Sequence, residues 1–136
     1  MQITASEAET VEAGRELAQR LRPGAVVLLE GPLGAGKTAF VRGLAAGLGC
    51  DADAVSSPTF TIVQEYRGRV TLEHVDLYRL TPPEVDDLAL EDLMGATVLA
   101  VEWPDRWLAA PDAAYVVRLD FAGDDRRRIA VTEPQV

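Results

Sequence analysis

One octet of this chain combines the residue types that hold a nucleoside triphosphate. Residues 31–38 read Gly-Pro-Leu-Gly-Ala-Gly-Lys-Thr and fit the pattern G-x-x-x-x-G-K-[ST]. In such a phosphate-binding loop, backbone N–H groups surround the phosphates, the lysine neutralises the β and γ groups, and the hydroxyl ligates Mg²⁺. Lys37 is the only lysine among 13 cationic side chains, and an ammonium and a guanidinium are not interchangeable. We therefore assign Lys37 to phosphate binding and Thr38 to the metal.

The segments on both sides of the octet supply the setting that this motif requires. An apolar run at 25–30 predicts a buried strand before it, and apolar residues at helical spacing predict a helix over 38–48 after it. Strand, glycine-rich loop and helix distinguish a nucleotide site from a chance turn. The residues expected to contact nucleotide in this unit are Gly31, Leu33, Gly34, Ala35, Gly36, Lys37, Thr38 and Ala39.

Two carboxylates compete to share the metal with Thr38. Phosphoryl transfer on such a loop needs an acid at the end of a neighbouring strand. Glu102 ends the apolar run 97–102, which is typical of a central parallel strand, and a carboxylate there is costly without a cation or donor nearby. Asp76 ends an amphipathic run, where an edge carboxylate that caps the next turn is the plainer interpretation. The pattern favours Glu102 as the Mg²⁺ ligand, although both acids could share one ion.

Four further features have a functional and a structural interpretation. His74 shares a strand face with Asp76, so it could lie near the phosphates, but a satisfied structural histidine is favoured. The segment Ser56–Thr59 could be a switch loop that senses the γ-phosphate, or a turn that starts a strand. Trp103 could stack on nucleotide or belong to the core. The run Arg126–Arg128 could reach adenine or phosphates, or form an exposed rim.

The nucleotide base can be argued from what the chain lacks. It contains no asparagine, so the Asn-Lys-x-Asp element of guanine-specific proteins cannot be present. Asp92–Gly95 matches the string D-x-x-G, but it ends a helical pattern instead of following a strand. The sequence therefore favours ATP over GTP.

Composition indicates one soluble domain over residues 1–136. The chain is 48% hydrophobic and 26% charged, with net charge −9 and an estimated pI near 4.5. Scattered cations argue against a direct grip on tRNA or other nucleic acid. The chain shows neither a leader peptide pattern nor an apolar run long enough for a membrane span. One cysteine, Cys50, suits a reducing cytoplasm.

The pattern of elements predicts a single α/β domain of the P-loop NTPase-like class. Runs at 60–66 and 70–76 flank a short turn, as do runs at 115–121 and 128–132, and each pair predicts an antiparallel hairpin. Helices are expected from Ser6 to about Arg20 and from Thr81 to Gly95. We expect a mixed sheet with a parallel centre, antiparallel edge strands and helices on both faces.

Four motifs in order carry a family resemblance that covers about residues 6–131. They are Leu33–Thr38, Ser57–Thr61, the run His74-Val75-Asp76-Leu77-Tyr78-Arg79-Leu80, and Val101-Glu102-Trp103-Pro104. The chain closely resembles the TsaE (YjeE) family of small bacterial P-loop ATPases. That resemblance implies a cytoplasmic protein needed to make threonylcarbamoyladenosine in tRNAs that read codons beginning with A. It also implies ATP and Mg²⁺ as cofactors and the TsaD and TsaB proteins as partners.

The resemblance also implies roles for individual residues. Lys37 contacts phosphates, Thr38 and Glu102 hold Mg²⁺, and Asp76 is a further carboxylate needed for hydrolysis. Trp103 matches the tryptophan that follows the acid in the family. Ser6 and Arg126 are assigned to the adenine from the ends of the chain. The residues assigned to catalysis are thus Lys37, Thr38, Asp76 and Glu102, and those assigned to the metal are Thr38, Glu102 and Asp76.

Two other functions fit the same loop. One is a nucleotide-gated adaptor that binds ATP and a partner without essential hydrolysis. The other is a small-molecule kinase, although 136 residues leave little room for an acceptor pocket and a lid. For the ATPase, no arginine finger is evident near the loop, so hydrolysis is expected to be slow until a partner accelerates it.

Overall fold

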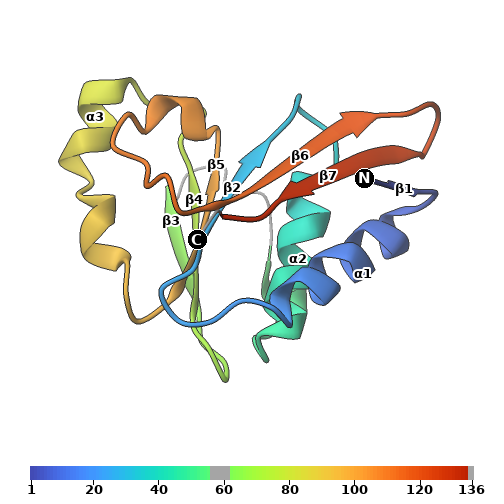
Figure 1. Ribbon diagram of the computed structural model, residues 1–136, viewed down its shortest axis with the longest axis horizontal. Helices are drawn as coiled ribbons and strands as arrows, with labels where there is room; N and C mark the ends of the chain where they lie inside the picture. The colour runs from blue at the N-terminus through green and yellow to red at the C-terminus, as the bar shows by residue number, and fades with distance from the viewer. Residues whose placement is uncertain (56–61, 135–136) are drawn as a thin grey trace.

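The computed structural model describes residues 1–55 and 62–134, which form one seven-stranded sheet with helices (Figure 1). The expected switch segment Ser56–Thr59 lies outside the described residues. The elements in chain order are β1 (Gln2–Thr4), α1 (Glu7–Ala18), β2 (Val26–Glu30), α2 (Lys37–Gly47), η1 (Ala52–Ala54), β3 (Val63–Tyr66), β4 (Leu72–Asp76), α3 (Pro82–Asp87), η2 (Leu90–Leu93), β5 (Val98–Glu102), η3 (Pro104–Arg106), β6 (Tyr115–Phe121) and β7 (Arg127–Thr132).

The sheet is mixed, with its parallel strands in the centre. Its order is β1-β7-β6-β2-β5-β4-β3. The pairs β6–β2, β2–β5 and β5–β4 are parallel, whereas β7, β1 and β3 join their neighbours antiparallel. Because parallel strands end at a common edge, the carboxyl ends of β2, β5 and β4 meet beside the glycine-rich loop. The predicted mixed sheet and both predicted hairpins are confirmed.

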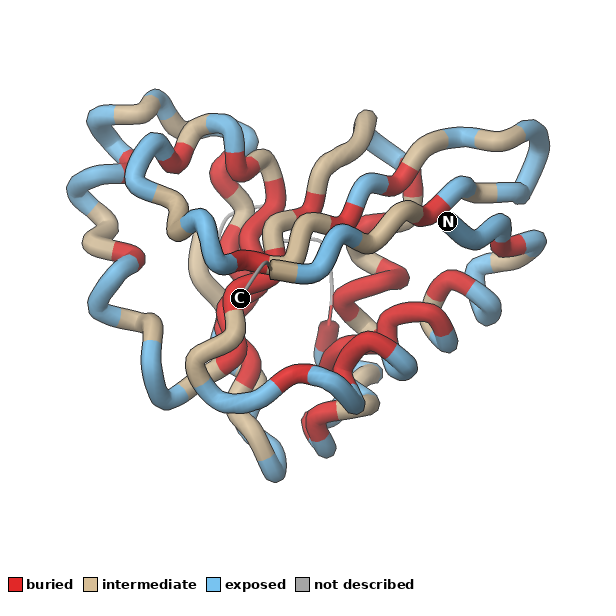
Figure 2. Tube along the Cα trace, in the orientation of Figure 1, coloured by how far each residue is buried: buried red, intermediate tan, exposed pale blue. Residues whose placement is uncertain are grey.

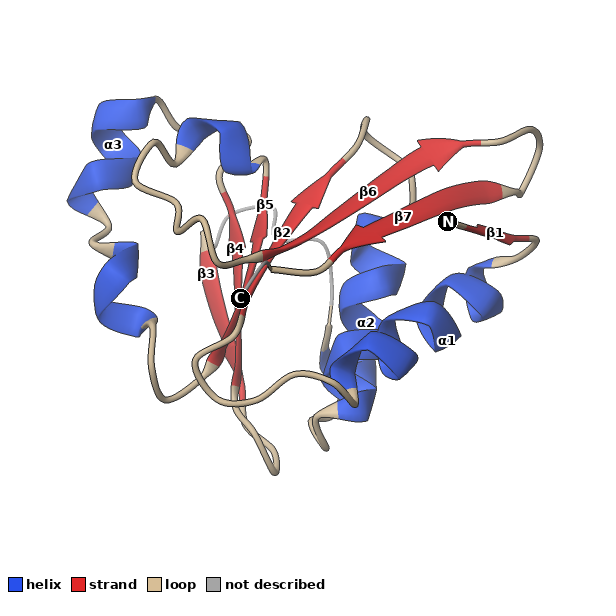
Figure 3. Cartoon of the chain, viewed as in Figure 1, coloured by secondary structure: helices blue, strands red, loops and turns tan. Residues whose placement is uncertain are grey.

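Helices cover both faces of the sheet, as expected (Figure 3). Alternate residues of each central strand face opposite layers. On β2, Val27 and Leu29 join the core beneath α1 and α2, while Val26 joins the core beneath α3 and η2. Buried residues accordingly follow the central strands and the inner sides of α1 and α2 (Figure 2).

Glycines bring α1 and α2 into unusually close contact. A Cβ atom on Gly14 would lie 2.2 Å from the Phe40 carbonyl oxygen, and one on Gly43 would lie 1.9 Å from the Val11 carbonyl oxygen. Neither position therefore tolerates a larger residue without moving a backbone. This contact fixes α2, and with it the loop that precedes α2, against the rest of the domain.

Two local expectations need correction, and one strand was not expected. The strand β4 is not an edge strand: it lies between β3 and β5, and its residues Leu72–Val75 are buried. The helix expected from Thr81 to Gly95 is split, because Ala89 adopts a left-handed φ of 50° between α3 and η2. The short strand β1 was not predicted, since three residues carry too little pattern.

Among the described helices, none combines the length and apolar character that a membrane crossing requires.

Candidate nucleotide site

The loop between β2 and α2 presents free backbone donors at a helix start. Gly36 caps α2 with a left-handed φ of 101° and no side-chain hydrogen bond, and Gly34 is also left-handed with a φ of 79°. A side chain at either position would be strained in this conformation. The first N–H groups of a helix lack partners within it and carry partial positive charge. An anion therefore fits this end of α2.

A cavity of about 1030 Å³ opens in front of this loop. Ten of the residues predicted to form the site line it: Ser6, Leu33, Gly34, Gly36, Lys37, Thr38, Ala39, Asp76, Glu102 and Trp103. They come from the α1 start, the loop, the first turn of α2, and the ends of β4 and β5. Segments far apart in sequence thus meet around one space, which is large enough for a nucleotide.

The other three predicted contacts lie outside this lining. Ala35 is fully buried and its N–H donates to the Pro32 carbonyl within the loop, 3.2 Å away. Gly31 borders a second, smaller cavity of about 310 Å³. Arg126 lies in the β6–β7 turn, and its neighbour Arg127 lines the main cavity instead. Arg126 is exposed in the turn, whereas Arg127 begins β7, and a sequence pattern does not locate the start of a strand to the residue.

The ammonium of Lys37 is held within the site. Its Nζ donates to the Gly31 carbonyl at 2.7 Å and lies 3.9 Å from the centroid of the Trp103 ring. Burial lowers the pKa of Lys37, and the nearby carboxylates of Glu102 and Asp76 oppose that shift. An ammonium has three donors, so the bond to Gly31 leaves two for a ligand.

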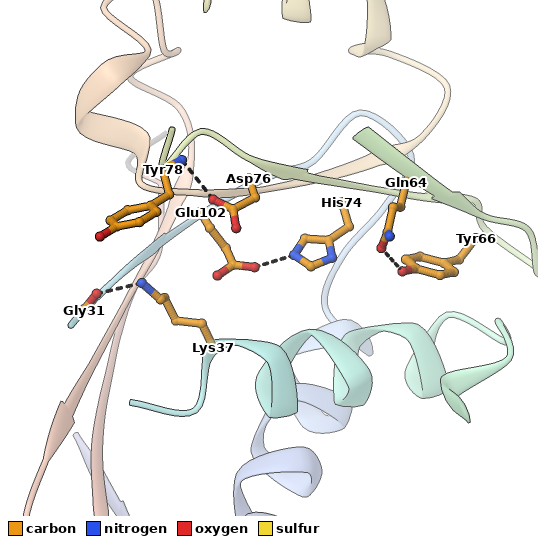
Figure 4. A network of polar contacts seen from close by, with 8 residues as sticks. All are labelled: Gly31, Lys37, Gln64, Tyr66, His74, Asp76, Tyr78 and Glu102. Carbon is orange, nitrogen blue, oxygen red and sulfur yellow. Dashed lines mark hydrogen bonds and ion pairs between the residues drawn. The ribbon is translucent and has the colours of Figure 1, made fainter. Parts of the chain in front are cut away.

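The two candidate acids end neighbouring parallel strands in register (Figure 4). Glu102 is 5% exposed, and its Oε2 lies 2.5 Å from Nε2 of the fully buried His74. The Oδ1 of Asp76 accepts the Tyr78 N–H at 2.9 Å. Burial raises the pKa of Asp76, the Tyr78 N–H lowers it, and Glu102 raises it again. Each acid thus has one oxygen held by the protein.

Trp103 closes one side of the site in a strained conformation. Its backbone is left-handed, with φ of 60° and ψ of 53°, which is rare for a bulky residue. Its ring packs on that of Tyr78, with centroids 4.9 Å apart and planes at 43°. Strain of this kind persists where the surroundings enforce it, often at functional sites. Trp103 thus lines the cavity and, partly buried, also packs against the core beneath α3 and η2.

Three arginines lie at the cavity, and the sequence had singled out only Arg127, as a member of the run Arg126–Arg128. Arg42, Arg79 and Arg127 all line it, so arginines are available at the cavity although no sequence motif marks one of them as an arginine finger. Arg42 is bound to Glu7 at 2.9 Å, whereas exposed Arg79 has no ion pair or hydrogen bond to the described residues. The signal for Arg79 was present, since it lies three residues after Asp76 in the motif that begins at His74.

The residues present fit a nucleotide carrying a magnesium ion. Thr38 offers a hydroxyl, and Glu102 and Asp76 offer hard carboxylate oxygens, which Mg²⁺ prefers. Among residues 1–55 and 62–134, no group of three or more His, Cys, Asp or Glu side chains could hold a metal unaided. Phosphate oxygens and water would therefore complete the coordination.

Comparison with known proteins identifies relatives over nearly the whole chain. The family model described as threonylcarbamoyl adenosine biosynthesis protein TsaE matches residues 4–129. A protein of Treponema pallidum named tRNA threonylcarbamoyladenosine biosynthesis protein TsaE is 39% identical over 95% of this chain and 97% of its own length. A Bacillus subtilis protein of the same name is 41% identical, over 95% of this chain and 82% of its own length.

A solved structure shares the fold. The crystal structure of Bacillus subtilis YdiB superposes with a TM-score of 0.81 and 34% sequence identity. The match covers 98% of this chain and 84% of YdiB.

Proposed function

Because this chain belongs to the TsaE family, we propose that it is a Mg²⁺-dependent ATPase that supports threonylcarbamoyladenosine modification of tRNA. The observation that carries the proposal is the convergence of Lys37, Thr38, Asp76 and Glu102 on one cavity at the uncapped start of α2. The names of the relatives supply the tRNA modification. We propose that the modified tRNAs are those that read codons beginning with A. We also propose that the protein is cytoplasmic and that residues 1–136 form one P-loop ATPase domain.

In the proposed site, the chain binds and orients the triphosphate. The free N–H groups at the α2 start and the two spare donors of Lys37 hold phosphate oxygens. Thr38 and Glu102 hold Mg²⁺, with Asp76 beside them. The ion, when bound, offsets the negative charge of the β and γ phosphates. Asp76, in register with Glu102 at the same edge of the sheet, is assigned as a further carboxylate needed for hydrolysis.

Two partners are part of the proposal. We assign this chain to an assembly with the TsaD and TsaB proteins, and its net charge of −9 supports leaving tRNA contact to them. A pull-down with TsaD and TsaB, with and without ATP, tests the assignment. Capture that depends on nucleotide is the expected result, and no capture in either condition contradicts it.

Loss of the Lys37 ammonium tests the ATP site itself. Lys37→Ala removes a charge-assisted contact of roughly 1.5–3 kcal/mol, so ATP should bind about 10- to 100-fold more weakly. Titration calorimetry measures this affinity directly. Arg67→Ala is the matched control, because Arg67 also carries one positive charge but is 87% exposed and pairs with Glu65 away from the cavity. Equal affinity for wild type and Lys37→Ala would refute the site.

A further inference from the structure

His74 is a buried polar side chain beside the candidate metal ligands. It lies on β4 between Leu72 and Asp76, on the sheet face covered by α1 and α2, and is fully buried. Its Nε2 lies 2.5 Å from Oε2 of Glu102 on the neighbouring strand. A carboxylate can only accept, so the ring donates this bond from Nε2. Two strands are thereby joined at the wall of the cavity.

The histidine makes only one hydrogen bond within the described residues. Its Nδ1 is buried and has no partner there. An unpaired buried polar atom destabilises a fold, so an apolar residue would suit the core at this position better. Within the described residues, the ring therefore does not join Glu102 to a second hydrogen-bonding group. What it adds to this position is the one bond to Glu102.

Glu102 depends on that bond for its orientation. Its long side chain has several rotatable bonds, and the His74 contact is the only hydrogen bond to the carboxyl group within the described residues. One oxygen turns to the ring and the other turns away from it (Figure 4). The contact thus leaves a single oxygen for a ligand in the cavity that Glu102 lines.

We infer that His74 is a positioning residue that holds Glu102 in the orientation needed for the metal–nucleotide complex. The inference rests on the proposed function, because it concerns the metal ligand of that same site. Partners that orient a metal ligand typically contribute 10- to 100-fold to metal affinity. His74 contributes through Glu102 and contacts neither nucleotide nor ion itself.

Three substitutions separate positioning from packing. His74→Phe keeps a ring and removes the donor. His74→Gln places an amide N–H close to the position of Nε2, whereas the shorter His74→Asn places its amide near Nδ1, out of reach of Glu102. Leu72→Ala is the matched control, because Leu72 is fully buried on the same face of β4 and does not line the cavity.

The measurement is Mn²⁺ affinity by electron paramagnetic resonance, with a non-hydrolysable ATP analogue bound. Nucleotide affinity in excess chelator is measured alongside. We expect His74→Phe and His74→Asn to weaken Mn²⁺ binding about 10- to 100-fold, while His74→Gln restores most of it. Leu72→Ala should lower stability without changing Mn²⁺ affinity, and nucleotide affinity without metal should stay constant throughout.

Several outcomes would overturn the inference. Wild-type Mn²⁺ affinity in His74→Asn would do so, and so would equal losses in the Gln and Asn variants, which would indicate packing alone. If His74→Phe does not fold, the Gln–Asn pair carries the test. In a Glu102→Ala background, a further loss from His74→Asn would also contradict the inference, since no acceptor side chain remains there for His74 to position. Failure of the proposed function is distinct: wild type and Lys37→Ala would then bind the nucleotide equally.

Discussion

Two glutamates are buried on neighbouring strands of the sheet and face opposite layers of helices. Glu102 on β5 is 5% exposed and faces α1 and α2, and Glu73 on β4 is 6% exposed and faces the side of α3. Glu102 receives a hydrogen bond from His74 and lies near the Lys37 ammonium. Glu73 instead shares a hydrogen bond with another acid, Glu65, directly across from it on β3.

Since the two acids are equally buried, the groups that contact each carboxyl, and not its burial, account for the difference between a structural acid and a candidate metal ligand. Burial, followed by the hydrogen bond and charge of Glu65, raises the pKa of Glu73 to about 7. That acid therefore tends toward the neutral form, which suits a structural contact. Glu102 has a donor and a cation as neighbours and lines the cavity, so its second oxygen is available to a metal ion.

The largest expected effect is on hydrolysis. Glu102→Gln should keep nucleotide binding and lower Mg²⁺-dependent ATP hydrolysis on the order of 100-fold, because an amide is a far weaker ligand for this ion. Glu73→Gln, an equally buried acid changed in the same way, should leave the rate unchanged. Phosphate release assays measure both. Full activity in Glu102→Gln would indicate that Asp76, and not Glu102, holds the metal. The functional contrast between Glu102 and Glu73 would then not hold.

The same pair of substitutions also separates adaptor from ATPase. If Glu102→Gln keeps TsaD–TsaB binding and supports tRNA modification without turnover, hydrolysis is not essential and the adaptor is the better description. Loss of modification together with turnover favours the ATPase.

The next expected effect is on how the free energy of unfolding changes with pH. The pKa of Glu73 is raised from 4.5 to about 7 in the fold, so between these values the native state binds more protons than the unfolded chain. The free energy of unfolding should therefore fall as pH rises from about 4.5 to about 7. Glu73→Gln should remove this pH-dependent loss of stability, which amounts to on the order of 3 kcal/mol by pH 8. Urea denaturation at several pH values measures it, and an unchanged slope would contradict the assignment.

The smallest expected effect is on ATP affinity, and it compares two neighbouring arginines of β7 of which only one lines the cavity. Arg127 lines the cavity, its guanidinium carbon lies 4.8 Å from the centroid of Phe121, and its buried Nε has no partner in the described residues. Arg127→Ala should weaken ATP binding severalfold, about 1 kcal/mol. Arg128, the next residue on the strand, is exposed and outside the lining, so Arg128→Ala is the control. A larger loss in Arg126→Ala than in Arg127→Ala would restore the sequence-based assignment.

Regular patterns made the centre of the fold predictable. The octet at 31–38 and the apolar runs on β2 and β5 identified the loop and its parallel strands, because a strand buried on both faces has a distinctive composition. Strand order was not available from the pattern. Asp76 was therefore placed at an edge, although β4 pairs with β5 in the interior of the sheet and sets Asp76 opposite Glu102.

Site residues outside the motif were harder to predict because they depend on packing. The link between His74 and Glu102 joins residues 28 apart, and no local pattern reports it. Arg79 and Arg127 reach the cavity through the turn after β4 and the alternation of β7. The sequence can mark such residues as candidates, but their three-dimensional neighbours decide which of them reach the cavity.

The glycine contact between α1 and α2 limits which parts of the structure could move when a nucleotide binds. With the two backbones touching at Gly14 and Gly43, α2 has no free space in which to slide along its neighbour. A rearrangement at the loop must then travel by another route, and the strained Trp103 stacked on Tyr78 is the adjoining contact. The helical pair is thus the fixed side of the cavity, and the Trp103–Tyr78 contact forms part of the other side.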